Sequence, residues 1–288
     1  MKRQKILVML SGGLDSRLVV KIMQEQGYDV TALYFKLPFS KDVTSEIKKF
    51  CKKQKVKLKI FDYTKEKLLK KYLKIIEAPK YGRGAGVNPC IDCRIFILNK
   101  AREYANKNKF DVIATGEVLG QRPMSQNKKA MEIVEEESKL KGRLLRSLID
   151  LGFSGRRREK QIKLANKFKI FYPNPAGGCL LCEKALKKRF EFLLKREMNE
   201  KEVKLVGIGR HFLIDKCWIV LGRNEKENKI IEKLKIGKII IPEKIGPSAI
   251  ILDKCTKKTK DKVKKLINAY SKGVDLKERK KFQKYELK

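Results

Sequence analysis

The chain is poor in histidine, tryptophan and acidic residues, and it lacks a long apolar run. It has one histidine, His211, among 288 residues. A histidine-based metal site and a Ser-His-Asp triad are therefore both nearly excluded. No stretch of about eighteen apolar residues occurs, which excludes a transmembrane helix. The start, MKRQKILVMLSGG, has the charged beginning of a signal peptide, but its apolar part is short and runs into a glycine turn. We read it as a first strand and expect a cytoplasmic protein.

Two common phosphate-loop patterns are also absent. There is no G-x-x-x-x-G-K-[ST], and no G-x-G-x-x-G follows the first predicted strand. Instead, the apolar run Ile6 to Leu10 leads into SGGLDS, Ser11 to Ser16, and then into a helical pattern. A strand, a glycine turn and a helix direct backbone N–H groups and the helix dipole at an anion. Glycines allow the close approach of that anion and the tight turn. The pattern predicts a phosphate site at this turn.

Acidic residues are outnumbered by basic ones, 33 against 71, for a net charge of +38. The excess is spread along the chain, with +14 on residues 201–288 and +24 on residues 1–200. Such a field favours a polyanionic partner, and RNA or DNA is the natural candidate. Lysine-rich usage in a biased genome or a hot habitat explains the charge equally well.

Strand and helix patterns alternate through the first part of the chain. Apolar strands are predicted at 29–35, 57–61 and 110–114, with helices at 42–54, 65–76, 94–107 and ending near 137, and a further strand or its approach at 142–149. This alternation predicts an α/β fold, a Rossmann-like parallel sheet with helices on both faces. Ligands of such sheets bind at the carboxyl ends of the strands. We expect this domain to span residues 1–170, a cysteine-containing connection 171–200, and a smaller basic α+β domain 201–288.

Seven cysteines are present, and four of them form two C-x-x-C pairs, Cys90 with Cys93 and Cys179 with Cys182. An odd number of cysteines in a chain without a secretion signal argues against a disulfide framework. The other three, Cys51, Cys217 and Cys255, lie in apolar or helical contexts and are expected to be packing residues. Both pairs follow segments rich in glycine and proline, so each is predicted to lie in a loop that turns two thiolates toward one metal.

The SGGLDS loop resembles the signature of the PP-loop ATP pyrophosphatases. Together with C-x-x-C and TGEVLGQRPMSQ, it is similar to the PP-loop domain of tRNA 4-thiouridine synthetases and, more loosely, to tRNA 2-thiouridylases. The resemblance covers roughly residues 4–182. The C-terminal part faintly resembles an RNA-binding domain of the NFACT type. The N-terminal RNA-binding domain usual in 4-thiouridine synthetases, and the rhodanese domain of some members, are not visible here.

The resemblance implies ATP and Mg²⁺ as cofactors, with cleavage between the α and β phosphates. The residues implied in binding the nucleotide are Ser11, Gly12, Gly13, Leu14, Asp15, Ser16, Thr115, Gly116, Glu117 and Gln121. Asp15 is also implied as catalytic. Phe35, at the end of the second predicted strand, packs against an adenine in one reading and against the core in another.

The resemblance further implies that Cys90, Cys93 and Cys179 take part in catalysis. Some members hold a 4Fe-4S cluster through three such cysteines, and Cys182 is then a fourth ligand or a spare. Structural zinc is one alternative. Thiols that carry and resolve a persulfide without metal are another.

The function implied is ATP-dependent tRNA thiolation, with AMP displaced from an adenylated uridine by sulfide or a persulfide. The partners are tRNA and a sulfur donor, and no membrane. Alternatives are a PP-loop ligase or amidotransferase acting on a small molecule, and a non-catalytic protein of RNA binding or quality control. The oligomeric state is open, with a homodimer as one option.

Overall fold

A computed structural model describes residues 3–174, 178–243, 245–273 and 276–288. The chain divides into two units, Met1–Cys182 and Glu183–Lys288. The boundary falls inside the segment 171–200 that we predict as a connection. All four cysteines of the C-x-x-C pairs lie in the first unit. Helices in the described ranges are too short or too polar to span a bilayer.

The first unit is built on a five-stranded parallel sheet in the order β3-β2-β1-β4-β5. The strands are β1 (Lys5–Met9), β2 (Asp29–Lys36), β3 (Lys57–Asp62), β4 (Val112–Thr115) and β5 (Leu144–Leu145). The predicted α/β fold is thus confirmed. Strand order reverses between β1 and β4, and the crevice outside the carboxyl ends of two such strands is where these sheets bind ligands.

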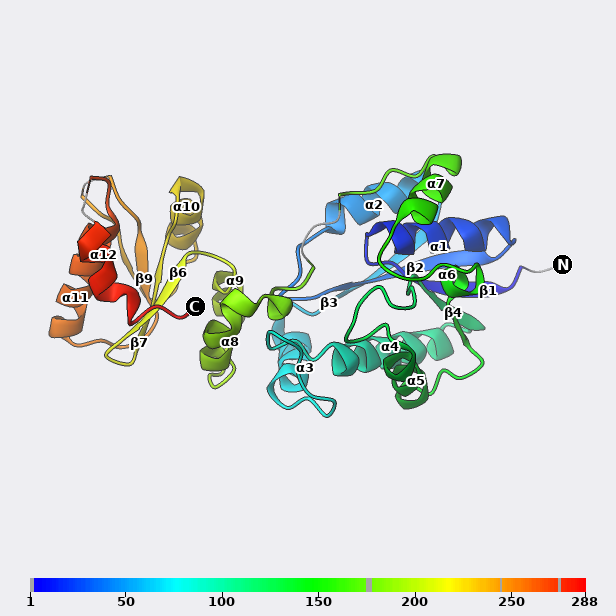
Figure 1. Cartoon of the computed structure of the whole chain (residues 1–288), viewed down its shortest axis with the longest axis horizontal. Coiled ribbons are helices and arrows are strands. Elements are labelled where there is room, and N and C mark those ends of the chain that lie inside the picture. The colour runs from blue at the N-terminus through cyan, green and yellow to red at the C-terminus, as the bar shows by residue number, and fades with distance from the viewer. Residues whose placement is uncertain (1–2, 175–177, 244, 274–275) are drawn as a thin grey trace. The chain divides into compact units, whose positions relative to one another are not determined.

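Helices cover both faces of this sheet (Figure 1). One face carries α1 (Leu14–Glu25), α2 (Thr44–Lys53), α6 (Ser147–Asp150) and α7 (Glu159–Lys167). The other carries α3 (Glu66–Glu77), α4 (Cys90–Lys107) and α5 (Lys128–Glu137). Side chains alternate along β1, so Ile6 and Val8 join the core beneath α1 while Leu7 and Met9 face the opposite layer. Burial on both faces explains why β1 reads as a continuous apolar run.

Two elements differ from their predictions. The helix expected to begin at Arg94 begins at Cys90, with Pro89 as its N-cap residue. Cys90 and Cys93 therefore lie on the first turn of α4, and the prediction of a loop is wrong for this pair. The stretch 142–149 holds a strand of only two residues before α6. Cys182 lies in a short 3₁₀ turn, Leu180–Cys182, and Cys179 directly precedes it.

The second unit is an antiparallel sheet in the order β6-β7-β9-β8 with helices, which confirms the predicted α+β class. Its strands are β6 (Arg210–Ile214), β7 (Cys217–Leu221), β8 (Lys238–Ile240) and β9 (Ala249–Ile251). Its helices are the 3₁₀ turn Lys184–Leu186, α8 (Lys187–Leu193), α9 (Glu200–Leu205), α10 (Glu225–Lys233), α11 (Lys257–Tyr270) and α12 (Leu276–Gln283). Apolar residues of β6, β7 and β9 pack against Val263, Leu266 and Ile267 of α11.

Cys217 and Cys255 form a disulfide in this unit. The expectation that both are simple packing residues is wrong. Cys217 opens β7 and Cys255 follows β9, and these strands are neighbours in the sheet, so the two thiols meet although 38 residues separate them. Cys51 is buried and free, as expected of a packing residue.

Candidate functional site

The predicted phosphate loop connects β1 to α1 at the carboxyl edge of the sheet. Gly13 is the N-cap residue of α1 and provides no side-chain cap, so the first N–H groups of this helix remain available to a ligand. The hydroxyl of Ser16 donates to the Gly13 carbonyl over 3.0 Å and accepts from Ser11, from both N–H and hydroxyl, over 3.2 Å. The loop is thereby held in a defined conformation before any anion binds.

Asp15 lies in the first turn of α1 and is 9% exposed. Its Oδ2 accepts a hydrogen bond of 3.0 Å from Gln121 Nε2. Its Oδ1 is buried and has no hydrogen-bond partner among the described residues. A buried carboxylate oxygen without a partner is costly, and a bound cation or a donor on a ligand would satisfy it. The residue thus fits the predicted Mg²⁺.

The end of β4 forms the second wall of the crevice. A Cβ on Gly116 would lie 2.7 Å from the backbone N of Ser16 and 2.8 Å from the carbonyl carbon of Asp15. Only glycine permits this approach of the two backbones. The predicted pair of Gly116 and Gln121 is therefore brought directly against the predicted phosphate loop.

Glu117 is 2% exposed and serves as the anchor of a buried ion-pair network. Arg94 from α4 and Arg146 after β5 both bind its carboxylate, at 2.8 Å and 3.2 Å, and Thr115 Oγ1 donates to it over 3.0 Å. Burial acts to raise the pKa of Glu117, but the two arginines prevail and hold it below the ordinary value. Since these contacts use both carboxylate oxygens, the nucleotide contact predicted for Glu117 stays a prediction.

Phe35 ends in the core rather than in an open crevice. Its ring packs on Phe61 and Tyr63, with ring centroids 5.5 Å and 5.9 Å apart. These contacts favour the interpretation of Phe35 as a core residue, and its stacking on adenine stays a prediction.

The two C-x-x-C pairs meet beside the loop 78–89. Gly86 approaches the second pair so closely that a Cβ would lie 2.3 Å from the carbonyl oxygen of Leu181. The N–H of Val87 donates to that carbonyl over 2.9 Å, and Cys179 forms a β-bridge with Ser40 after β2. These backbone contacts thus bring the second pair close to the first, although Cys93 and Cys179 are 86 residues apart in sequence.

The thiols lie near enough to one another to affect their pKa values. The side chain of Cys182 and burial raise the pKa of Cys90, and burial raises the pKa of Cys93 to about 11. The side chain of Cys179 likewise raises the pKa of Cys182. These three thiols are therefore protonated near neutral pH, and they become nucleophiles or ligands only when a proton is withdrawn.

Asn88, which we did not single out from the sequence, organises this group. It is buried, and its Nδ2 donates to Cys90 Sγ over 3.1 Å and to Met124 Sδ over 3.3 Å. Tyr72 contacts Cys93 Sγ at 3.5 Å. Met124 belongs to the segment 116–126 that also supplies Gln121, so one stretch of chain reaches from the phosphate loop to the thiols. The Asn-Pro before Cys90 was the available sequence signal.

The thiols do not form a closed metal site in this arrangement. In the ranges that the structure describes, no three His, Cys, Asp or Glu side chains are placed to hold a metal ion. The four cysteines predicted as ligands lie together as free thiols.

Arg17 is a second residue without a sequence signal. It is buried in the first turn of α1, and its Nε donates to the Gly12 carbonyl over 2.8 Å. Its Nη1 donates to the carbonyl of Phe171 over 2.9 Å. Because 154 residues separate Arg17 from Phe171, only the folded chain reveals that the segment leading to Cys179 starts at the phosphate loop.

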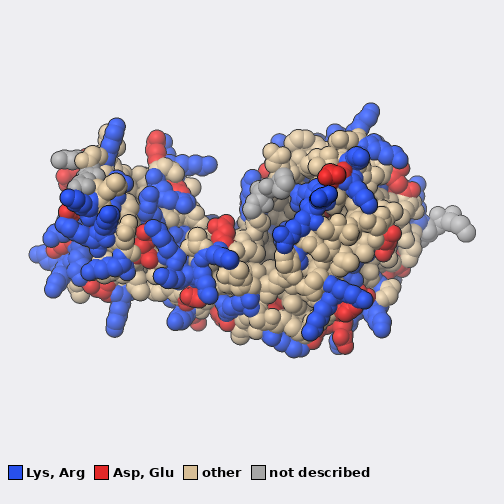
Figure 2. Space-filling model, viewed as in Figure 1, with Lys and Arg blue, Asp and Glu red and all other residues tan. Residues whose placement is uncertain are grey.

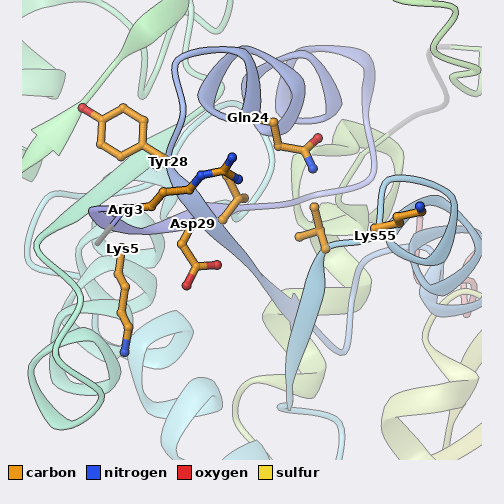
Figure 3. Close-up of a pocket in the computed structure, with 8 residues that line it drawn as sticks. Arg3, Lys5, Gln24, Tyr28, Asp29 and Lys55 are labelled. Carbon is orange, nitrogen blue, oxygen red and sulfur yellow. The ribbon is translucent and has the colours of Figure 1, made fainter. Parts of the chain in front are cut away.

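A separate hollow lies at the opposite edge of the sheet (Figure 3). It is lined by Arg3, Lys5, Gln24, Tyr28, Asp29, Val30, Lys55 and Val56. Lys5 and Asp29 are the first residues of β1 and β2, whereas the phosphate loop follows the last residue of β1. This hollow therefore does not belong to the candidate site.

A phosphate-binding loop at the switch point of a five-stranded parallel sheet defines a PP-loop domain of the HUP class. Residues 4–148, half of the chain, match the family described as "tRNA methyl transferase HUP domain", and the chain belongs to this family. Residues 209–283, in the second unit, match the family described as "NFACT protein RNA binding domain".

Curated relatives are similar to the first unit or to most of the chain. The tRNA-specific 2-thiouridylase MnmA of Karelsulcia muelleri is 27% identical, over 83% of this chain and 65% of its own length. The enzyme of the same name from Treponema denticola is 34% identical, over 39% of this chain and 32% of its own. The chain thus spans from about a third to 65% of the length of these relatives.

Two solved structures are similar at low identity. A 4-thiouridine synthetase in complex with RNA and ATP covers 70% of this chain and 53% of its own, with 19% identity and a TM-score of 0.45. A predicted tRNA methyltransferase subunit from Methanocaldococcus jannaschii covers 57% of this chain and 76% of its own, with 16% identity and a TM-score of 0.40.

Proposed function

We propose that this protein is an ATP-dependent tRNA sulfurtransferase. The observation that carries the proposal is the convergence of a PP-loop and four cysteine thiols at one edge of one sheet, joined by the segment 116–126. The PP-loop offers an anion site, the thiols offer sulfur chemistry, and curated relatives are named 2-thiouridylases.

In the first step, a uridine carbonyl oxygen attacks the α-phosphorus of ATP and pyrophosphate leaves. The loop Ser11–Ser16 and the N-terminus of α1 bind the phosphates, because their free N–H groups stabilise the charge on the leaving group. Asp15 would hold Mg²⁺ through its unpartnered oxygen, and the bound ion would neutralise phosphate charge. Gln121 orients Asp15 by its hydrogen bond to the other oxygen.

In the second step, sulfur attacks the activated ring carbon, and the bond from that carbon to the AMP oxygen breaks. The sulfur comes as sulfide, or as the outer sulfur of a persulfide on one of Cys90, Cys93 and Cys179. On the persulfide route a neighbouring thiol of this group then attacks the inner sulfur, so that the S–S bond breaks, the thiolated base is released and a disulfide is left, which an external thiol reduces. The raised pKa values of Cys90 and Cys93 mean that these free thiols are weak nucleophiles, so the transferred sulfur has to be supplied by a donor.

The proposal includes a 4Fe-4S cluster held by Cys90, Cys93 and Cys179, with Cys182 beside it. Donor chemistry supports it, because cysteine thiolates are the ligands of such clusters. When bound, the cluster would supply iron that accepts sulfide. Anaerobic purification with iron, zinc and sulfide analysis decides among the cluster, zinc and free thiols. Zinc without iron, or no metal at all, would refute the cluster and leave the thiols as persulfide carriers.

RNA is the proposed partner, and the second unit is proposed to bind it. Its match to an RNA-binding family and its basic surface support this assignment. Figure 2 shows how densely lysine and arginine cover this unit. Such a surface contacts the phosphate backbone and the shape of the RNA rather than its sequence.

The function is tested by ATP–pyrophosphate exchange and by thiolation of bulk tRNA with sulfide. Asp15→Ala is expected to abolish tRNA-dependent AMP formation, whereas Cys90→Ser is expected to retain adenylation and lose thiolation. Cys51→Ser, the matched control at a buried free cysteine, is expected to keep both. Exchange without thiolation, driven by a small molecule instead of tRNA, would favour a ligase. No exchange in the wild type would favour a non-catalytic RNA-binding protein.

A further inference from the structure

Phe171 presents its aromatic ring to solvent beside the phosphate loop. Its side chain is 79% exposed, although the neighbours Ile170 and Tyr172 belong to or pack against the hydrophobic core. A ring that is left outside while both neighbours turn inward is an unusual use of a large apolar residue.

The backbone of Phe171 is fixed in place. Arg17 donates to its carbonyl oxygen and, through Nε, to the carbonyl of Gly12 in the phosphate loop. Arg17 is itself 4% exposed and lies over the ring of Phe50, so it has little freedom to move. The exposed ring thus starts from a rigid anchor one side chain away from the loop.

The chain that follows Phe171 leads to the thiols. Cys179, eight residues further on, pairs with Ser40 after the carboxyl end of β2. Phe171 therefore lies at the start of a segment whose two ends are fixed at the two halves of the candidate site.

Positively charged side chains also lie at the edge of the sheet that carries the phosphate loop. Ser154 forms a β-bridge with Leu119, and the N–H of Gly155 donates to the Leu119 carbonyl over 2.7 Å. Leu119 stands two residues before Gln121, which binds Asp15. The exposed side chains of Arg156 and Arg157 follow directly from this anchor.

We propose that Phe171 is the stacking surface for an unstacked RNA base, with Arg156 and Arg157 binding the phosphates next to that base. An enzyme that modifies a base has to take it out of its stack, and aromatic faces accept such bases. Exposed rings flanked by cationic side chains are how proteins bind single-stranded RNA. This inference rests on the proposed function only in naming the base as the one that is modified.

The adenine of ATP is the competing occupant, since it also has a π-face. The two exposed arginines favour RNA, because they extend the positive edge beyond the phosphate loop. A polynucleotide backbone has further phosphates to place there, whereas a single nucleotide already has its phosphates on the loop.

Photocrosslinking tests the contact directly. A short oligouridylate that carries one 5-iodouridine is irradiated with the full-length protein, and the crosslinked peptide is identified by mass spectrometry. The expected crosslink is at Phe171, persists with saturating ATP and disappears with excess unlabelled oligouridylate. A crosslink at Phe171 that ATP abolishes, or none at that residue, would overturn the inference.

Three variants distinguish base stacking on the ring from the effect of an apolar side chain of similar size. Phe171→Leu keeps an apolar side chain but removes the ring, and it should weaken oligouridylate binding about tenfold, as expected for one lost stacking contact. Phe171→Trp should restore binding, and Leu151→Ala, at a side chain 54% exposed elsewhere in this unit, should not change it. Equal affinity of Phe171→Leu and wild type would contradict the proposal.

A pyrophosphate-exchange assay on the same variants keeps the two proposals apart. Because Phe171 points away from the core, the variants should fold, which thermal unfolding checks. If Phe171→Leu weakens oligouridylate binding while a small molecule instead of tRNA drives exchange in the wild type, the RNA contact stands and only the assignment of tRNA as the substrate is refuted. A crosslink at Phe171 in a wild type that shows no exchange refutes adenylation and keeps the RNA contact.

Discussion

Gly116 is the residue at which the two halves of the proposed nucleotide site touch. Gly116→Ala should destabilise the first unit by about 1–3 kcal/mol and raise the KM for ATP, because its Cβ has to displace the backbone of Ser16. Thermal unfolding and exchange kinetics measure the two effects. Gly27→Ala is the matched control. It places a residue at a φ of +85° with open space around its Cβ, so it should cost stability and leave the KM unchanged. An unaltered KM in Gly116→Ala would contradict the close approach.

The burial of His211 predicts how the stability of the second unit depends on pH. Burial, with the positive charge of Arg189 second, lowers the pKa of His211 to about 3. Its Nε2 faces the carbonyls of Leu205 and Ile208, and its Nδ1 accepts from Trp218. Between pH 6.5, its ordinary pKa, and about pH 3, His211 is protonated in the unfolded chain but neutral in the folded chain. Stability should therefore be complete above about pH 6.5 and fall as the pH falls toward 3, by up to about 1.4 kcal/mol per unit.

The single tryptophan allows the pH dependence of the second unit's stability to be measured. Trp218 is fully buried in the second unit, so its fluorescence reports urea unfolding of that unit within the full-length chain. Between pH 7 and pH 5 the wild type should lose roughly 2 kcal/mol. The variant His211→Gln should be less stable at pH 7 but show a flatter pH dependence. Identical slopes for the two proteins would disprove the assignment.

At the scale of elements, the disulfide between β7 and the end of β9 gives a chemical prediction. Alkylation of the denatured, unreduced protein should modify five cysteines, Cys51 and the two C-x-x-C pairs, and leave Cys217 and Cys255 protected. Reduction should lower the stability of the second unit by roughly 3–4 kcal/mol, as expected for closing a loop of this length. Seven alkylated cysteines would show that the bridge does not form.

The sequence predicted best those elements whose signal is local. β1 is buried on both faces and reads as a continuous apolar run, and α2 and α3 repeat apolar residues at helical spacing. The start of α4 was missed because Gly and Pro before Cys90 suggested a loop, whereas Pro89 at the N-cap position begins the helix. β6 carries a weaker local signal because His211 interrupts its apolar residues, and only the folded contacts of His211 with Trp218 and with the carbonyls of Leu205 and Ile208 explain why a histidine is buried there.

The candidate site likewise has parts that the sequence predicted and parts that it did not. Its loop and the Thr-Gly-Glu strand end carry motifs, and parallel strands bring their carboxyl ends to one edge, so their proximity followed from the fold class. The contacts of Arg17 with Phe171 and of Asn88 with Cys90 and Met124 carry no motif. They depend on the close approach of distant backbones at Gly86 and Gly116, which no local pattern encodes.

For the whole molecule, the charge of +38 predicts RNA binding that weakens steeply with salt. The plot of log K for bulk tRNA against log salt concentration should be linear, with a slope close to −0.9 for each phosphate that is neutralised. Whether the second unit supplies those contacts is decided by two matched triple variants. Neutralising the exposed lysines Lys257, Lys264 and Lys265 of α11 to glutamine should reduce the steepness of the slope by about 3.

The control neutralises three exposed lysines of α3 in the first unit, Lys67, Lys70 and Lys71. Both triple variants have the same net charge, so a general field effect would change both slopes equally. Local contacts with RNA would change only the α11 variant, because counterions are released where phosphates are bound. Equal slopes in the two variants would therefore mean that the charge acts over the whole surface, and that the second unit is not the RNA-binding element.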